Sequence, residues 1–155
     1  MNNSLQEFKY EDLNVIFVVL VVLLVIDLPM IFLINNDMYM NQLKKINKDD
    51  KIDSSRSLIF ALLTYLLLVL GIYYFAVRQK NVYNGMFLGL IIYGVYNYTN
   101  VSTIANYGVK EAIIDTTWGT ILCGLVTYIV LEFTNIPLHV AHVNEILTTT
   151  EVPSN

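Results

Sequence analysis

Four long apolar segments constrain the fold of this chain more than any other feature. They cover residues 13–35, 57–77, 85–104 and 112–132. Each is close to the ~20 residues that a helix needs to cross a ~30 Å hydrocarbon core. Backbone polar groups inside a bilayer must be hydrogen-bonded within the span, so each segment is expected to be a helix. The first two segments are apolar all round, which disfavours a water-soluble four-helix protein.

The composition favours the same class. Hydrophobic residues make up 55% of the chain and charged residues 14%, whereas soluble domains average roughly 45–50% and about 25%. The net charge is −4, and no basic run indicates nucleic acid as a partner. The single cysteine, Cys123, excludes an internal disulfide and a cysteine-based zinc site. The partner that the composition predicts is a lipid bilayer.

The connections between the segments predict their arrangement. Residues 78–84 and 105–111 are short connections, which join antiparallel neighbours in an up-down bundle. We therefore predict an all-α integral membrane protein, with a four-transmembrane-helix up-down bundle at residues 13–132. An N-terminal tail covers residues 1–12, and a C-terminal tail covers residues 133–155. The C-terminal tail opens with Asn-Ile-Pro, which predicts a turn followed by a short interfacial helix.

The basic residues predict an orientation. Both termini share a side of the membrane with the connection at 78–84, and this side carries Lys9, Arg78 and Lys80. Lysine and arginine are enriched in cytoplasmic loops, and the opposite side carries more of them. We therefore predict that both termini are non-cytoplasmic, in a membrane that the sequence does not identify. The opposite side carries Lys44, Lys45, Lys48, Lys51, Arg56 and Lys110.

Polar residues concentrate in one half of the predicted membrane. Asp27 lies just past the middle of the first segment, and Asn97 and Asn100 lie past the middle of the third. Asp115 opens the fourth. At ~1.5 Å rise per residue, all four fall in the half next to the Lys-rich loop. An acid near the bilayer centre costs on the order of 2.5–3.5 kcal/mol on insertion scales, so such residues usually face the bundle interior.

Shared helix faces predict which segments pack together. In the third segment, Gly85, Gly89 and Asn97 are separated by multiples of four and share a face. Glycines on that face permit close approach of a second helix. The short connection that follows predicts that Asn100 donates from its amide to the Asp115 carboxylate. The matching face of the fourth segment carries Asp115, Trp118 and Gly119.

We therefore predict a polar intramembrane site in this half of the membrane. The two acids would accept protons or hydrogen bonds, the asparagines would orient a ligand or the carboxylates, and the tryptophan would pack the helix interface. A plainer alternative is interhelical bonding, worth about 0.6 kcal/mol per bond on average. Asp115 would also complement a helix dipole, and Trp118 would suit an interfacial anchor. The predicted site consists of Asp27, Asn97, Asn100, Asp115 and Trp118.

Two of these motifs together resemble a known family. Residues 96–100, YNYTN, followed by residues 115–119, DTTWG, are similar to the Y-D-x-T-N … D-x-x-W-G signature of the DUF2177 family. That family consists of small, predicted four-helix membrane proteins of unknown function. Asp27 matches an acid in the first span, and Gly71 with residues 75–77 matches the end of the second. The resemblance covers roughly residues 13–132 and implies the fold and the membrane location.

The chain departs from the family pattern at two positions. The family's acid in the third-span motif is Asn97 here, and the family's tryptophan after the first-span acid is Met30, with Pro29 beside it. If the family uses a carboxylate at the third-span position for proton chemistry, this chain lacks that activity. If the position only donates or accepts a hydrogen bond, asparagine is adequate.

Three classes of function stay open at the level of the sequence. One is a membrane protein that binds or modifies a lipid at the polar site. Another is a small-solute or proton-coupled transporter, which four short helices would form only as a homo-oligomer. The third is a structural assembly partner. No phosphate loop, HExxH or GxSxG motif is present, so we expect no cofactor and identify no catalytic residue. His139 and His142 suit an amphipathic tail better than a metal site.

Overall fold

The computed structural model describes residues 10–31 and 54–149, with side chains described except at Glu11, Ser54 and positions 135–149. All regular elements in these ranges are helices. They are α1 (Tyr10–Pro29), α3 (Ser54–Ile72), the π-helix η2 (Tyr73–Val77), α4 (Val82–Thr103) and α5 (Val109–Thr149). The predicted segments therefore form helices close to the expected positions. Most of the polar loop at 36–56 lies outside the described residues.

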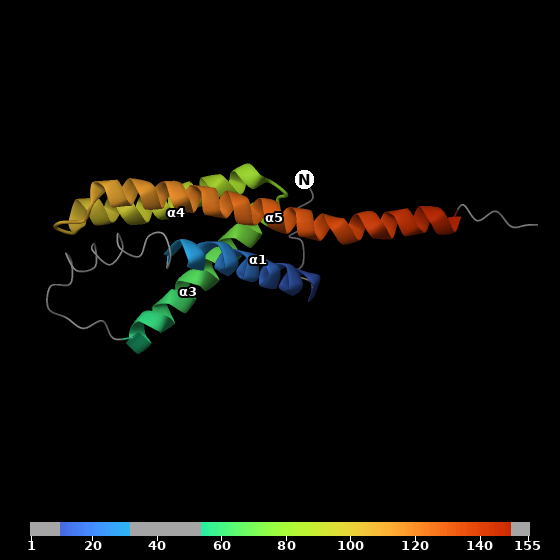
Figure 1. Ribbon diagram of the computed structural model, residues 1–155, viewed down its shortest axis with the longest axis horizontal. Coiled ribbons are helices and arrows are strands. Elements are labelled where there is room, and N and C mark those ends of the chain that lie inside the picture. Colours follow the sequence, from blue (N-terminus) through green and yellow to red (C-terminus); the bar gives the residue numbers. More distant parts are fainter. Residues whose placement is uncertain (1–9, 32–53, 150–155) are drawn as a thin grey trace, which may run out of the picture.

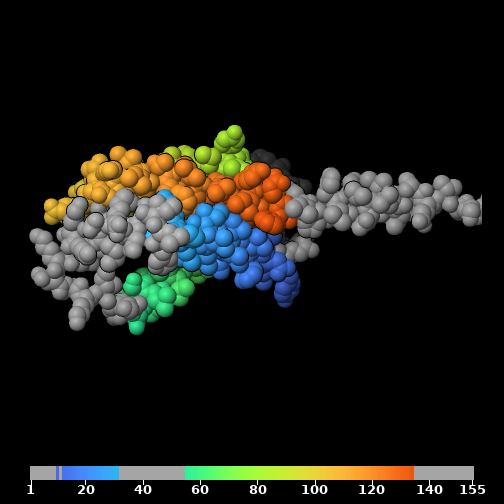
Figure 2. Space-filling model, in the orientation of Figure 1, coloured from blue at the N-terminus to red at the C-terminus, as the bar shows by residue number. Residues whose placement is uncertain are grey.

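The helices form the predicted up-down arrangement. Figure 1 shows α4 and α5 side by side along their shared length, joined by a short turn, while α3 crosses them obliquely. Figure 2 shows α1 directly against α5. The prediction of an all-α membrane protein is confirmed.

Three of the helical stretches are long and apolar enough to cross a membrane: Asp12–Pro29, Ser55–Val77 and Val109–Thr134. Helix α4 is not among them, since it carries most of the polar residues of the third segment. Its 22 residues span about 33 Å at the α-helical rise of ~1.5 Å per residue. It packs along α5, and its buried Asn97 bonds to that helix, while Tyr96, Tyr98 and Thr99 lie on its exposed side.

Glycines bring α4 and α5 into close contact. A Cβ atom at Gly89 would meet the backbone carbonyl of Gly119. A Cβ atom at Gly85 would meet the Thr127 side chain and a backbone carbonyl one turn before it. Gly119 in turn leaves room for the ring of Tyr93. The three glycines singled out in the sequence thus all lie at this interface.

The turn between α4 and α5 sets the register of the hairpin. Asn106 has φ of 69°, a left-handed conformation that asparagine adopts more readily than most residues. Helix α4 ends with a hydrogen bond of 2.9 Å from the backbone N–H of Ile104 to the Asn100 carbonyl. Residues equidistant from Asn106 then face each other, so position 97 meets 115 and position 93 meets 119.

The core lies where α1, α3 and α5 meet. Its fully buried members include Val19 and Leu23 from α1, Ile72 from α3, and Leu122 and Val126 from α5. Large apolar side chains also cover the outside of the bundle, which is unfavourable in water and suits lipid contact. Examples are Phe17, Leu58, Ile59, Phe60, Leu67, Phe87, Val95 and Tyr128.

Two π-helical turns interrupt the regular helices. One follows Pro29 at Met30 and Ile31, where the proline cannot donate the backbone hydrogen bond of a regular turn. The other is η2, where the Arg78 N–H donates to the Tyr73 carbonyl, five residues back, at 2.9 Å. Such π-turns are frequent at functional sites, and each one here borders a feature described below.

Helix α5 corrects one prediction. The turn expected at Asn-Ile-Pro is wrong, because α5 continues without a break from Val109 to Thr149. A proline inside a helix removes one backbone N–H donor and disfavours the helix by about 3 kcal/mol, so the turn was a reasonable expectation. Helical residues flank Pro137 on both sides. The last third of α5 therefore extends past the other helices (Figure 1), and its interfacial location stays a prediction.

Gly89→Ala tests the close α4–α5 contact. The added methyl group would meet backbone of α5, so we expect a loss of about 1–3 kcal/mol of stability, as overpacking typically costs. A fluorescence-based melting curve in detergent measures it. Gly94→Ala is the matched control, because its Cβ would make ordinary contacts of 3.7 Å with Thr116 and Tyr98. Equal melting temperatures for the two variants would contradict the packing described.

Candidate functional site

Asp27 joins three helices through its carboxyl group. Near the end of α1, it is only 6% exposed. Its Oδ2 accepts a hydrogen bond of 2.7 Å from the Tyr65 hydroxyl on α3. Its Oδ1 accepts one of 3.0 Å from the Trp118 indole on α5. Both oxygens of this acid therefore have a neutral donor, and each donor belongs to a different helix.

Asn97 is the centre of a second set of hydrogen bonds, between α4 and α5. Its side chain is 1% exposed. The Nδ2 group donates 2.7 Å to Asp115 Oδ2 and 2.9 Å to the Tyr93 carbonyl, one turn earlier on α4. A longer contact of 3.4 Å reaches Thr116 Oγ1. Its Oδ1 accepts 2.9 Å from the Tyr107 hydroxyl, so both ends of the amide are bonded.

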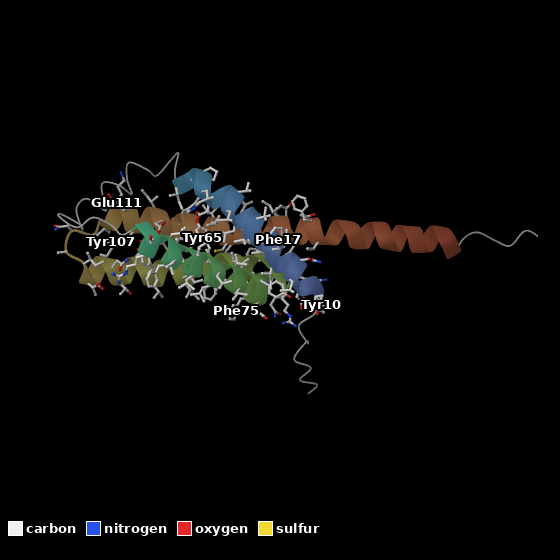
Figure 3. All side chains as sticks on the ribbon, turned by 90° about the horizontal axis from the view of Figure 1, so that it is seen from below. Tyr10, Phe17, Tyr65, Phe75, Tyr107 and Glu111 are labelled. Atoms are coloured by element: carbon white, nitrogen blue, oxygen red, sulfur yellow. The ribbon has the colours of Figure 1, made fainter. Side chains whose placement is uncertain are left out.

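Tyr107 connects this cluster to the membrane surface. It lies in the α4–α5 turn, and Figure 3 shows it at the same end of the molecule as Glu111. Burial raises the pKa of its phenol, while a hydrogen bond with the Asn100 side chain acts in the opposite direction. The phenol therefore stays protonated at neutral pH and remains a donor to Asn97.

Tyr93 lies between the two sets of hydrogen bonds. Its ring packs against Gly119, one residue after Trp118. Its backbone carbonyl accepts from Asn97 Nδ2 at 2.9 Å. We call the two sets of hydrogen bonds, with Tyr93 between them, the polar network.

The structure brings the predicted site residues together. Asp27, Asn97, Asp115 and Trp118 all take part in the hydrogen bonds of the polar network, and Asn100 reaches it through Tyr107. The partner of Asp115 is different from the predicted one, because Asn97 donates to it. The hairpin register explains this, since position 100 lies opposite position 112, which is an alanine.

Trp118 takes the interface role rather than that of a surface anchor. Its indole points to Asp27, and its ring packs against the apolar core. Thr64 of α3 is not among the described hydrogen-bond partners of the polar network. It is exposed, and its hydroxyl bonds the Phe60 carbonyl of its own helix at 2.9 Å.

Sequence reasoning missed three members of the polar network: Tyr65, Tyr107 and Thr116. Tyr65 lies in an otherwise apolar helix, and its depth along the second segment matches that of Asp27. That matching depth could have indicated Tyr65 from the sequence. Nothing in the sequence could have indicated Tyr107, because tyrosines are common in surface turns. Thr116 is 3% exposed and was hidden by its neighbour Asp115 in the motif.

The donors that the structure gives to the two acids are neutral. A carboxyl group held this way binds a proton or accepts hydrogen bonds, and it lacks the ligand set of a metal site. Within residues 10–31 and 54–134, no group of three or more His, Cys, Asp or Glu side chains is placed to hold a metal ion. Every buried side-chain nitrogen and oxygen among the described residues has a hydrogen-bond partner.

A second feature lies toward the opposite end of the bundle. A groove of about 800 Å³ opens along the side of α3 and η2, facing the start of α4. Figure 3 shows Phe75, one of its lining residues, farther from Tyr107 than Tyr65 is. The groove was not predicted, because its lining residues come from separate elements whose packing the sequence does not give. Its lining residues are Leu67, Leu70, Gly71, Tyr74, Phe75, Gln79 and Asn84.

The groove is amphipathic along its length. Leu67 and Leu70 line it toward the middle of the bundle, and Gln79 and Asn84 line it at the end near the turn between η2 and α4. The start of α4 is fixed by Asn81, whose side chain accepts from the backbone N–H of Tyr83 at 2.9 Å. Such an N-cap stabilises a helix by about 1 kcal/mol.

Spanning helices, a buried polar network and lipid-facing outer surfaces define a multi-pass α-helical membrane protein. The chain belongs to the DUF2177 family of predicted membrane proteins, whose model matches residues 13–132. Neither the curated proteins nor the solved structures that were searched contain a match to it.

Asn97→Ala tests the register of the polar network. This change removes the donor to Asp115 and the acceptor for Tyr107 together. Intramembrane hydrogen bonds contribute about 0.6 kcal/mol each and up to ~1.7, so we expect a loss of about 1–3 kcal/mol in detergent denaturation. Asn100→Ala, with a half-exposed side chain, is expected to lose less than half as much. A larger loss of stability for Asn100→Ala than for Asn97→Ala would contradict this register and favour a pairing of Asn100 with Asp115.

Proposed function

We propose that this membrane protein binds a lipid in the groove beside α3 and η2. The observation that carries the proposal is the groove itself, with apolar walls toward the bilayer centre and amide side chains at its outer end. A lipid has the same distribution of apolar and polar groups. Ligand sites are typically apolar concavities with a few placed polar groups, and lipid is the solvent on this face of the protein.

The polar network supports this proposal as a scaffold. Its central residues are buried and already bonded within the protein, so they leave little free capacity for a ligand. Through Tyr65, the network fixes α3 at a point two residues before the groove begins at Leu67. We propose that the position of this anchor sets the oblique path of α3 and keeps the groove open.

Leu67→Trp tests lipid binding. Leu67 is exposed and lines the groove, so the larger ring would fill the space without disturbing the core. We expect purified protein to carry bound lipid in native mass spectra, and the variant to lose most of it.

Leu63→Trp is the matched control, because it lies on the same helix and is exposed, yet does not line the groove. Retention of lipid by both variants would contradict the proposal. Similar melting temperatures for the two variants would exclude unfolding as the cause of any loss.

Proton binding by the polar network is a second candidate function. The observation that favours it is the pair of acids whose described donors are all neutral. An ionisable residue inside a membrane often marks a proton pathway. This candidate corresponds to the proton-coupled transporter that the sequence left open. The family's third acid is Asn97 in this chain, and here Asn97 would hold the Asp115 carboxyl group in place by a hydrogen bond.

The single tryptophan of the chain reports on this second candidate. Trp118 donates to Asp27, so a change in the protonation of Asp27 would alter the indole environment. We expect the emission of the protein in detergent to titrate with pH, and Asp27→Asn to abolish that titration. Asp12→Asn serves as the control, because Asp12 lies near the start of α1. A titration that persists in Asp27→Asn would exclude Asp27 as the proton-binding group.

A further inference from the structure

We propose that the exposed side of α4 from Tyr96 to Thr103 lies among lipid headgroups, so that the membrane is thinner beside α4 than beside α5. This surface is at the opposite end of α4 from the groove, which reaches α4 at Asn84. The proposal therefore does not depend on lipid binding in the groove. The partner that it assigns to α4 is the headgroup layer of the nearer leaflet.

Two exposed tyrosines mark one edge of the hydrocarbon region on the α4–α5 hairpin. Tyr83, near the start of α4, is 79% exposed, and Tyr128 on α5 is 52% exposed. They lie at nearly the same depth, because a Cβ atom at Gly85 of α4 would meet Thr127 of α5. Tyrosines are enriched where hydrocarbon meets the headgroups. Both helices therefore leave the hydrocarbon region at a similar depth on this side.

Beyond that edge, the exposed side of α4 is apolar for only a short distance. Its exposed apolar residues run from Met86 to Val95, which is about 14 Å at the α-helical rise of ~1.5 Å per residue. A hydrocarbon core of ~30 Å, measured from Tyr83, would end near Thr103. It would therefore enclose every exposed side chain of the last two turns of α4, and all of these carry hydroxyl groups. They are Tyr96, Tyr98, Thr99, Ser102 and Thr103.

The hydroxyl groups at the end of α4 suit headgroups and water better than acyl chains. Ser102 Oγ and Thr103 Oγ1 both donate to the Thr99 carbonyl, at 2.8 and 2.7 Å. A hydroxyl bonded in this way has placed its proton and still offers its oxygen as an acceptor. Water and headgroup N–H groups can donate to such an oxygen, and an acyl chain cannot.

The exposed side of α5 carries apolar residues over the same depth. Because position 97 meets 115, Thr99 is level with Ile113, which is 52% exposed. The exposed Thr117 interrupts this side, and its hydroxyl donates to the Ile113 carbonyl at 2.8 Å. A membrane of uniform thickness would place either the hydroxyls of α4 in hydrocarbon or Ile113 among headgroups. A short apolar surface is accommodated when the bilayer beside it thins.

A thinner membrane beside α4 would bring headgroups and water close to the polar network. Tyr96 directly precedes Asn97, which donates to the half-buried Asp115 at 2.7 Å. The headgroup layer would therefore reach the depth of Asp115, while Asp27 stays buried. This surface gives the polar network a polar border on one leaflet.

The test places nitroxide labels on single introduced cysteines of the full-length chain in palmitoyl-oleoyl-phosphatidylcholine vesicles. Thr99→Cys and Ile113→Cys are the depth-matched pair, and Ile91→Cys, exposed on the apolar part of α4, reports the hydrocarbon region. Cys123 is fully buried, and the parent chain measures any labelling of it. Electron paramagnetic resonance measures how often each label collides with oxygen, which is enriched in hydrocarbon, and with a water-soluble nickel complex.

We expect the Thr99 label to collide with the nickel complex several-fold more often than the Ile113 label, and the Ile91 label to collide mainly with oxygen. Adding Tyr98→Leu and Ser102→Leu to Thr99→Cys lengthens the apolar surface and should shift that label toward oxygen. Equal accessibility of the Thr99 and Ile113 labels, or no shift with the added leucines, overturns the proposal. A Thr99 label that meets neither reagent also overturns it, because a second copy of the chain would then cover this surface.

Discussion

The carboxyl group of Asp27 is the interaction on which the rest of the structure depends. It accepts hydrogen bonds from Tyr65 on α3 and Trp118 on α5, at 2.7 and 3.0 Å. An acid at this depth is costly unless it is partnered, and here each partner comes from a different helix. One side chain of α1 therefore fixes two other helices relative to it, in a bilayer where hydrophobicity alone does not drive helices together.

The α4–α5 hairpin makes this arrangement possible. Close glycine contacts bring the two helices together, and the turn at Asn106 sets their register. That register places Asn97 beside Asp115 and leaves Trp118, one turn further along α5, directed to Asp27. Helix α5 thus carries members of both sets of hydrogen bonds. The polar network is a consequence of glycine packing as much as of polar chemistry.

Much of this architecture was predictable from the sequence. Segment length and hydropathy predicted the helices, and the spacing of Gly85, Gly89 and Asn97 predicted the face that α4 turns toward α5. The sequence also singled out Asp27, Asn97, Asp115 and Trp118, which the structure places in hydrogen bonds between helices; that these residues form a functional site stays a prediction. The same reasoning paired Asp115 with Asn100, because a difference of one turn in hairpin register depends on the turn conformation.

Other features had no sequence signal that local rules could read. Tyr65 of α3 bonds to Asp27, a contact between residues 38 positions apart. The groove is lined by residues of α3, η2 and α4, so its shape depends on how these elements pack. Pro137 misled in the opposite way, because a proline inside a helix disfavours it by about 3 kcal/mol, whereas α5 continues through Pro137.

The most direct measurement of the central claim is the NMR signal of the one indole N–H group in the chain. Protein labelled with ¹⁵N-tryptophan gives a single such resonance from Trp118. If Trp118 donates to Asp27, this proton is protected from exchange with water, and Asp27→Ala shifts its resonance and removes the protection, while Asp12→Ala leaves both unchanged. An indole resonance that Asp27→Ala does not alter would contradict the account.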